Sequence, residues 1–176
     1  MKNLFRKVRR IVPGIAVLSI LVGFAVAQEN SAVRKINQKG KIVSKIAKGT
    51  FVVKVTPLAV EENVGDPLIG RLSLEKQLSG DLVGTSKGQM LGVQTEVKDS
   101  AGYVAMERFT GALGGKKGSF ALQHLGTMQG GKFDLNVIVV PDSGTGELAG
   151  LTGKMNIIIK DGKHLYEFEY SFEKKK

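Results

Sequence analysis

The stretch that decides the fold runs from Met106 to Gly126 and reads MERFTGALGGKKGSFALQHLG. It predicts two strands joined by a glycine-rich turn at residues 114–117, because glycine adopts the positive φ angles that hairpin turns require. A four-residue turn at this place would set Glu107 directly opposite His124. The sequence therefore predicts a carboxylate and an imidazole side by side on neighbouring strands.

Alternate side chains of this hairpin point to the same face of the sheet. One face is mostly apolar and holds Tyr103, Ala105, Glu107, Phe109, Phe120, Leu122 and His124. The other face is polar and holds Arg108, Thr110, Ser119 and Gln123. We expect the first face to be interior and the second to meet solvent.

The residues around this hairpin continue the two-residue period of strands. Further strands are predicted over residues 50–56, 69–78 and 133–140. The strand over 69–78 turns at Ser79-Gly80-Asp81 into another that runs through Met90. A compact loop with one helical turn is expected over residues 143–150. With the final hairpin the chain has eight antiparallel strands, so the predicted class is all-β, either a closed barrel or a sandwich.

The final hairpin has the clearest turn signal of the chain. Asp161-Gly162 is a favoured two-residue turn, and it sets Ile157 opposite Tyr166. Aromatic and acidic residues alternate in the last strand, which predicts that Tyr166, Phe168 and Tyr170 lie inside.

Composition excludes several classes of function. The 176 residues contain no Cys, so disulfides, thiol nucleophiles and zinc–thiolate sites are ruled out. Two histidines are too few to indicate a metal site, and the glycine spacings do not fit phosphate or dinucleotide loops, so no metal or cofactor is predicted. Five of the ten surplus positive charges lie within residues 1–10 and three at 174–176, a distribution that argues against nucleic-acid binding.

The N-terminus has the three parts of a secretory signal peptide, predicted over residues 1–27. A basic segment precedes the apolar run Ile11–Phe24, and Ala25-Val26-Ala27 forms a cleavage site before Gln28. The alternative is an uncleaved membrane anchor, but the run is short and contains Pro13-Gly14. We expect a periplasmic or secreted protein.

Three further segments follow the predicted signal peptide. Residues 28–48 form a basic lead-in, residues 49–173 the β-barrel domain, and residues 174–176 a basic tail. The lead-in has a thin apolar stripe, so contact with a membrane surface is less favoured than a solvated segment whose end flanks the first strand.

Glu107 and His124 are the candidate catalytic residues. A carboxylate and an imidazole on an apolar face can exchange a proton with a bound molecule or polarise its oxygen. The alternative is a polar pair that only fixes the strand register. The candidate ligand-binding residues on the interior faces are Tyr103, Phe109, Phe120, Leu122 and Tyr166.

Several segments resemble a bacterial family of unknown function that is assigned to the allene oxide cyclase-like barrels. They are Gly49-Thr50-Phe51, residues 107–111, Leu113-Gly114-Gly115, Gly118-Ser119-Phe120, residues 123–126 and residues 140–151. The resemblance implies a small eight-stranded antiparallel barrel, lipocalin-like in outline, with an apolar cavity. Its plant relatives, the allene oxide cyclases and dirigent proteins, steer ring closure or coupling of reactive intermediates. Their catalytic residues have no counterparts that can be placed here.

The sequence therefore leaves two candidate functions. The first is an exported barrel that binds a small apolar molecule in its lumen, with or without isomerising or cyclising it. The second is a non-catalytic secreted module whose barrel is packed solid and which acts through its surface; the sequence is compatible with a homo-oligomer. Cavity volume separates them, because aromatic side chains such as Phe51, Phe109 and Phe168 could fill the lumen.

Overall fold

The computed structural model describes residues 44–59, 65–66 and 68–173. The predicted signal peptide at 1–27, most of the basic lead-in at 28–48 and the tail at 174–176 lie outside these residues. Within them, no helix is long and apolar enough to cross a membrane.

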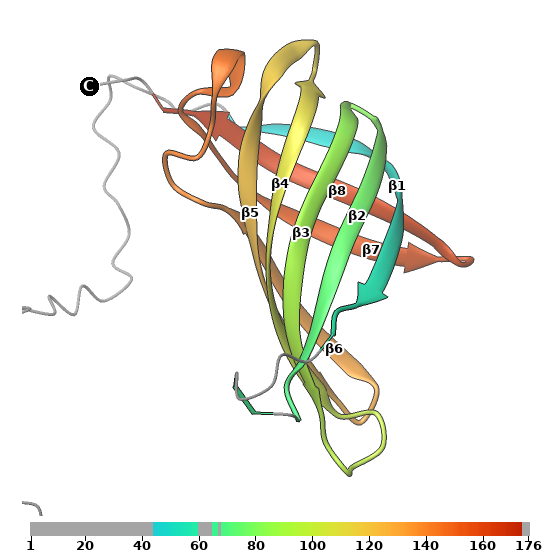
Figure 1. Ribbon diagram of the computed structural model, residues 1–176. Coiled ribbons are helices and arrows are strands. Elements are labelled where there is room, and N and C mark those ends of the chain that lie inside the picture. Colours follow the sequence, from blue (N-terminus) through green and yellow to red (C-terminus); the bar gives the residue numbers. More distant parts are fainter. Residues whose placement is uncertain (1–43, 60–64, 67, 174–176) are drawn as a thin grey trace, which may run out of the picture. The chain divides into compact units, whose positions relative to one another are not determined.

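Eight strands and one short helix make up the described chain (Figure 1). They are β1 (Lys45–Pro57), β2 (Gly70–Gly80), β3 (Leu82–Gln94), β4 (Ala101–Leu113), β5 (Lys116–Gln129), β6 (Lys132–Val139), the 3-10 helix η1 (Gly146–Leu148), β7 (Leu151–Lys160) and β8 (Lys163–Phe172). β1 begins five residues before the predicted strand, so Lys45 to Lys48, at the end of the predicted lead-in, belong to the barrel.

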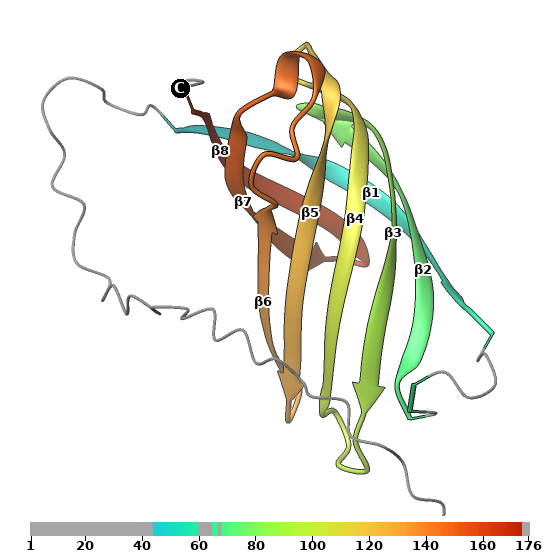
Figure 2. The same cartoon turned by 60° about the vertical axis from the view of Figure 1, so that its left-hand side comes forward.

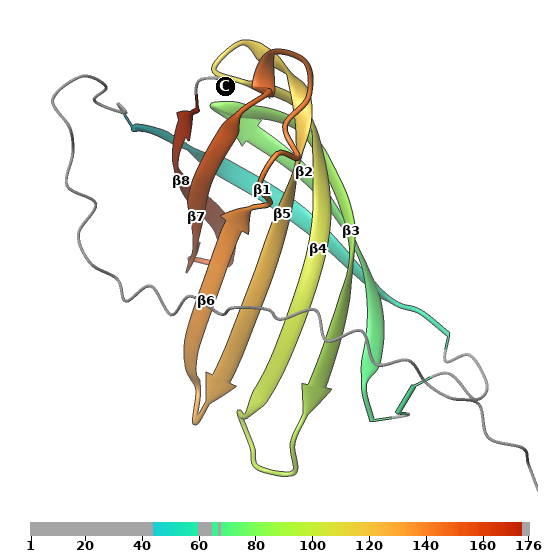
Figure 3. The same ribbon diagram turned by 90° about the vertical axis from the view of Figure 1, so that its left-hand side faces the viewer.

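Each strand pairs antiparallel with the next, and β1 pairs with β8 to close a barrel. The predicted all-β class and the eight-stranded antiparallel barrel are confirmed. Figures 2 and 3 show η1 at one end of this barrel and the β3–β4 turn at the other. The ladders are uneven: β6 and β7 share only the pair Ile138 and Lys154 among the described residues.

The turn of the central hairpin is shorter than predicted. Gly114 and Gly115 alone form it, with φ angles of 55° and 84°. Two consecutive positive φ angles give a turn whose twist matches that of the flanking strands. Glu107 therefore pairs with Leu122, and His124 pairs with Ala105, so the predicted direct pairing of Glu107 with His124 is wrong. The error is two residues along the strand, which leaves every side chain on its predicted face.

The final hairpin agrees with its prediction. Asp161 and Gly162 form the turn, with φ angles of 51° and 71°, and Ile157 pairs with Tyr166. Tyr166 and Phe168 are buried in the barrel. Tyr170 is half-buried and packs against the same core.

The half of the barrel nearer η1 is filled by side chains. Phe120 lies between Phe109 and Phe168, with ring centres 5.1 Å and 5.7 Å apart. Tyr166 closes this layer beside β2 and β3, where its hydroxyl accepts a hydrogen bond from the Leu82 amide at 2.8 Å. Aromatic packing of this kind leaves no room for a ligand.

Ser119 departs from the predicted solvated outer face. It is buried because the loop that carries η1 folds over the outside of β5. Its hydroxyl lies 2.7 Å from that of Thr145 and accepts a hydrogen bond from Arg108 at 2.7 Å. The outer wall is therefore braced by polar contacts at this end.

Candidate functional site

A buried ionic cluster of Glu107, Lys76 and His124 lies inside the barrel, next to the aromatic side chains of Phe109 and Phe120. Glu107 on β4 accepts hydrogen bonds at Oε1 from Lys76 Nζ of β2, at 2.8 Å, and from His124 Nε2 of β5, at 3.0 Å. The side chains are only 2%, 8% and 3% exposed, respectively. The donor role of Nε2 follows because an ionised carboxylate can only accept. Glu107 and His124 thus meet diagonally across the ladder, although they are not paired residues.

Opposing influences set the pKa of Glu107. Burial raises it, because an apolar interior disfavours the charged form. The hydrogen bond from His124 and the positive charge of Lys76 outweigh burial and lower the pKa to about 2. The carboxylate is therefore ionised throughout the physiological range of pH.

The second oxygen of this carboxylate, Oε2, is buried without a hydrogen-bond partner among the described residues, as is the hydroxyl of Ser86. Glu107, Ser86 and Lys76 line a cavity of about 10 Å³ whose other walls are apolar. That volume holds about one water molecule. The cavity is therefore too small in this structure to hold an organic molecule.

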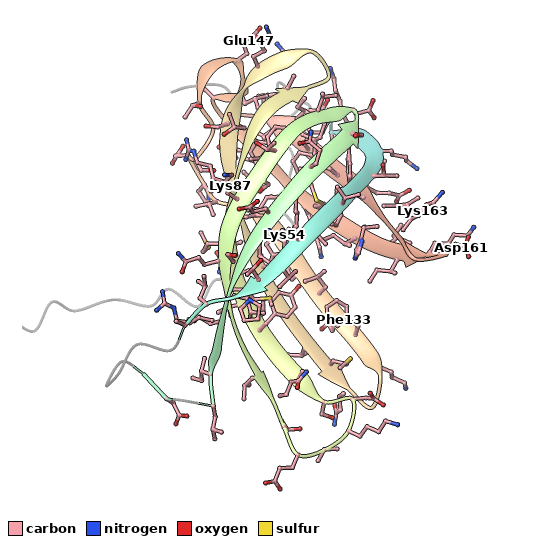
Figure 4. The ribbon with its side chains drawn as sticks, turned by 45° about the vertical axis from the view of Figure 1, so that its right-hand side comes forward. Lys54, Lys87, Phe133, Glu147, Asp161 and Lys163 are labelled. Carbon is pink, nitrogen blue, oxygen red and sulfur yellow. The ribbon has the colours of Figure 1, made fainter. Side chains whose placement is uncertain are left out.

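A larger pocket opens at the barrel end away from η1. Its volume is about 460 Å³, within the range of small-molecule sites. Among the described lining residues only Tyr103 and Gln94 have polar side chains, and none is charged. The apolar walls include Leu68, Leu72, Met90, Met128 and Phe133. Figure 4 shows Phe133 on β6, away from the turn that carries Asp161.

A row of glycines produces this pocket. Gly70 pairs with Gly92, Gly92 pairs with Tyr103, and Tyr103 pairs with Gly126, so the row crosses β2, β3, β4 and β5. All four positions line the pocket and lie on the inner face of the sheet, because each is an even number of residues from a buried residue of its own strand: Leu74, Ser86, Ala105 and His124, respectively. Tyr103 is therefore the one side chain that this row sends inward.

Tyr103 stands between the pocket and the ionic cluster. A Cβ atom on Gly126 would lie 2.2 Å from Cε1 of the Tyr103 ring, so the ring rests directly on the Gly126 backbone. The ring also stacks with Phe133, with centres 6.3 Å apart and planes at 15°. Burial, and then the negative charge of Glu107, raise the pKa of the Tyr103 phenol.

The residues singled out from the sequence are distributed over three places. Tyr103 lines the large pocket. The small cavity is lined by Glu107, Phe109, Phe120 and Leu122, and His124 contacts Glu107. Tyr166 lies in the packed core and lines neither space.

Sequence reasoning missed Lys76 and Ser86. Lys76 had a readable signal, because it falls between Leu74 and Leu78 on the apolar face of an alternating strand. Ser86 had none, since small polar residues are common on either face. Within the described ranges, no group of three or more His, Cys, Asp or Glu side chains is placed to hold a metal ion.

These features define the class: a small closed β-barrel with an ionic cluster in its core and an apolar pocket at one end. The chain belongs to the bacterial family described as "Protein of unknown function (DUF3224)", whose model matches residues 47–170.

One similar solved structure is the crystal structure of a protein with unknown function from the DUF3224 family from Shewanella oneidensis MR-1. It shares 45% sequence identity with this chain, the match covers 76% of this chain and 100% of that one, and the TM-score is 0.70. No curated protein matches the chain.

Proposed function

We propose that this protein binds a small apolar molecule in the pocket at the end of the barrel away from η1, and that it does so after export. The observation that carries the proposal is the row of inward-facing glycines, which leaves a space of about 460 Å³ in an otherwise packed barrel. The apolar walls would take up an apolar ligand by the hydrophobic effect. The resemblance to allene oxide cyclase-like barrels also favours such a ligand.

The backbone does not require glycine at two positions of this row. Neither Gly70 nor Gly92 has a positive φ angle. A Cβ atom on Gly92 would meet its nearest neighbours at 3.5 Å, and one on Gly70 at 3.7 Å, which are ordinary contacts. Glycine inside a strand weakens it, because it loses more conformational entropy on folding and packs nothing. Neither backbone conformation nor strand stability therefore accounts for glycine at these two positions. Its effect there is to leave the space of the pocket unfilled.

Isomerisation or cyclisation would need a protein group that touches the ligand. Tyr103 is the candidate, because its ring lines the pocket while Glu107 and His124 lie behind it in the barrel. In this arrangement Glu107 and His124 would act on the ligand through Tyr103, as positioning residues.

The first test fills the pocket. Gly92→Val is expected to weaken binding of methyl naphthyl ketone, a neutral probe, at least tenfold, with Gly92→Ala intermediate. Stability should stay the same or rise by about 0.5–1 kcal/mol, since a strand glycine is removed. Probe fluorescence gives the affinity and urea unfolding gives the stability.

The control is Thr127→Val, which places the same side chain on the exposed outer face of β5. It should leave the affinity unchanged. If Gly92→Val folds normally and still binds the probe as tightly as wild type, the pocket is not the binding site.

A second candidate function, contact through the surface, is supported by an apolar row on the outer wall. Leu91, Val104 and Leu125 are paired neighbours on β3, β4 and β5, and they are 46%, 48% and 55% exposed. Met106, 50% exposed, extends this row. Contiguous exposed apolar side chains mark association sites. A second copy of this chain, docking the same row around a two-fold axis, would cover it.

This association predicts a concentration-dependent mass. Light scattering should show dimers of the wild type and monomers of Val104→Glu, because the substitution would bury two carboxylates at the axis. Exposed Val52→Glu, on β1, should dimerise like the wild type. A wild type that stays monomeric at every concentration would contradict the second candidate.

A further inference from the structure

The phenol of Tyr103 gives the large pocket a specific chemical preference. We propose that the ligand is an uncharged apolar molecule with one hydrogen-bond-accepting oxygen, such as a ketone, ester or ether, and that Tyr103 donates to this oxygen. The inference rests on the proposed binding function and adds the class of ligand. It assigns Tyr103 as the residue that orients the ligand.

The first support is the distribution of polar groups around the pocket. Among the described lining residues, Gln94 is exposed near the end of β3, whereas Tyr103 is half-buried in the glycine row. The Tyr103 hydroxyl makes no hydrogen bond within the described part of the chain, so it is available to a ligand. A polar atom of the ligand that reaches this depth would otherwise lose its hydration without compensation.

The second support is the fixed orientation of the ring. Tyr103 rests on the backbone of Gly126 and stacks with Phe133. A donor held in place before binding loses little entropy when the ligand arrives. Its paired neighbours, Gly92 and Gly126, have no side chains that could cover the Tyr103 ring.

The third support is the negative charge of Glu107 near Tyr103. Burial raises the pKa of the Tyr103 phenol and the charge of the ionised Glu107 raises it further, so both favour the protonated, hydrogen-bond-donating form. Lys76, the buried cation nearby, is already bound to Glu107 at 2.8 Å and does not line the pocket. No cationic side chain is among the lining residues that the structure describes. A ligand with a carboxylate would therefore bury this charge in an apolar pocket without a cationic side chain to pair with it.

Three probes of similar shape test this preference: methyl naphthyl ketone, ethylnaphthalene and naphthoate. The chain has no Trp, so naphthalene fluorescence can be followed without tryptophan background. In the wild type, naphthoate should bind at least tenfold more weakly than the ketone. Tyr103→Phe should weaken binding of the ketone about fivefold and leave the affinity for ethylnaphthalene unchanged, because only the ketone accepts a hydrogen bond.

The outcomes separate the two proposals. If none of the probes binds the wild type, the proposed binding function fails. If ketone and hydrocarbon both bind but Tyr103→Phe weakens both equally or neither, the binding function stands and the role of Tyr103 is overturned. Equal affinity of the wild type for naphthoate and ketone also overturns the preference for an uncharged ligand.

Discussion

Tyr166→Ala should lower the free energy of unfolding by about 3–5 kcal/mol, the range for large side chains removed from a core. Tyr166 is 1% exposed and belongs to the aromatic core nearest η1. The ring also fills the space left by two glycines: a Cβ atom on Gly49 would lie 2.5 Å from the Tyr166 hydroxyl, and one on Gly80 would lie 3.3 Å from it. The surrounding backbone therefore cannot collapse easily into the cavity that alanine would leave.

Tyr166→Phe separates the hydroxyl from the ring. The hydroxyl accepts from the Leu82 amide at 2.8 Å and donates to the Ser79 carbonyl at 3.2 Å. Its removal leaves a buried amide without a partner, which should cost about 1–3 kcal/mol. Urea unfolding measures both variants. Ile159→Ala, on the same hairpin but 67% exposed, serves as control and should stay within about 0.5 kcal/mol. A loss that small for Tyr166→Ala would contradict the packed core.

The ionic cluster gives the second large effect. Lys76→Met and Glu107→Leu should each cost about 3–5 kcal/mol, because each leaves a buried polar group without its principal partner. The double variant should recover most of that loss, since no unpaired charge of the Lys76–Glu107 pair remains. Lys87→Met, at an exposed lysine of β3, is the matched control and should change stability by less than about 0.5 kcal/mol (Figure 4). Strictly additive losses in the double variant would show that Lys76 and Glu107 do not interact.

The same cluster predicts how stability depends on pH. The pKa of Glu107 is about 2 in the folded protein, below its ordinary value of 4.5, so the folded state favours the ionised form. The resulting stabilisation, about 3 kcal/mol, is fully present above the unfolded pKa and is lost as pH falls from about 4.5 to 2. Urea midpoints measured across this window should fall less steeply for Glu107→Gln than for the wild type. Equal slopes would show that Glu107 does not titrate with a lowered pKa.

The sequence predicts the hairpins well because local signals determine them. Alternation placed Tyr103, Glu107, Phe109 and His124 on the inner face correctly, and the Asp161-Gly162 turn set the last register. The register of the central hairpin was wrong, because four residues with turn propensity, 114–117, offer more than one turn length. A slip of two residues leaves the hydrophobic pattern unchanged, so alternation could not detect the error.

The pocket and Lys76 were not predictable to the same degree. Gly70, Gly92 and Gly126 come from three separate strands, and only the long-range register aligns them in a row beside Tyr103. The partner of Lys76 is equally distant, because Glu107 lies on β4 and reaches β2 across the barrel interior. Sequence patterns report which face a side chain occupies, whereas these contacts depend on how the barrel closes.

Barrel closure by β1 and β8 also determines how early the protein can fold during its synthesis. Seven of the strand pairings join neighbours along the chain, but the closing ladder joins β1 to β8, from Lys45 opposite Tyr170 to Phe51 opposite His164. During translation β8 leaves the ribosome after the other seven strands, so the barrel cannot close on the nascent chain before β8 has emerged. Until then β1 remains an open sheet edge, and Phe51 lacks the strand that packs beside it. Chains that terminate before β8 are therefore expected to associate through this edge.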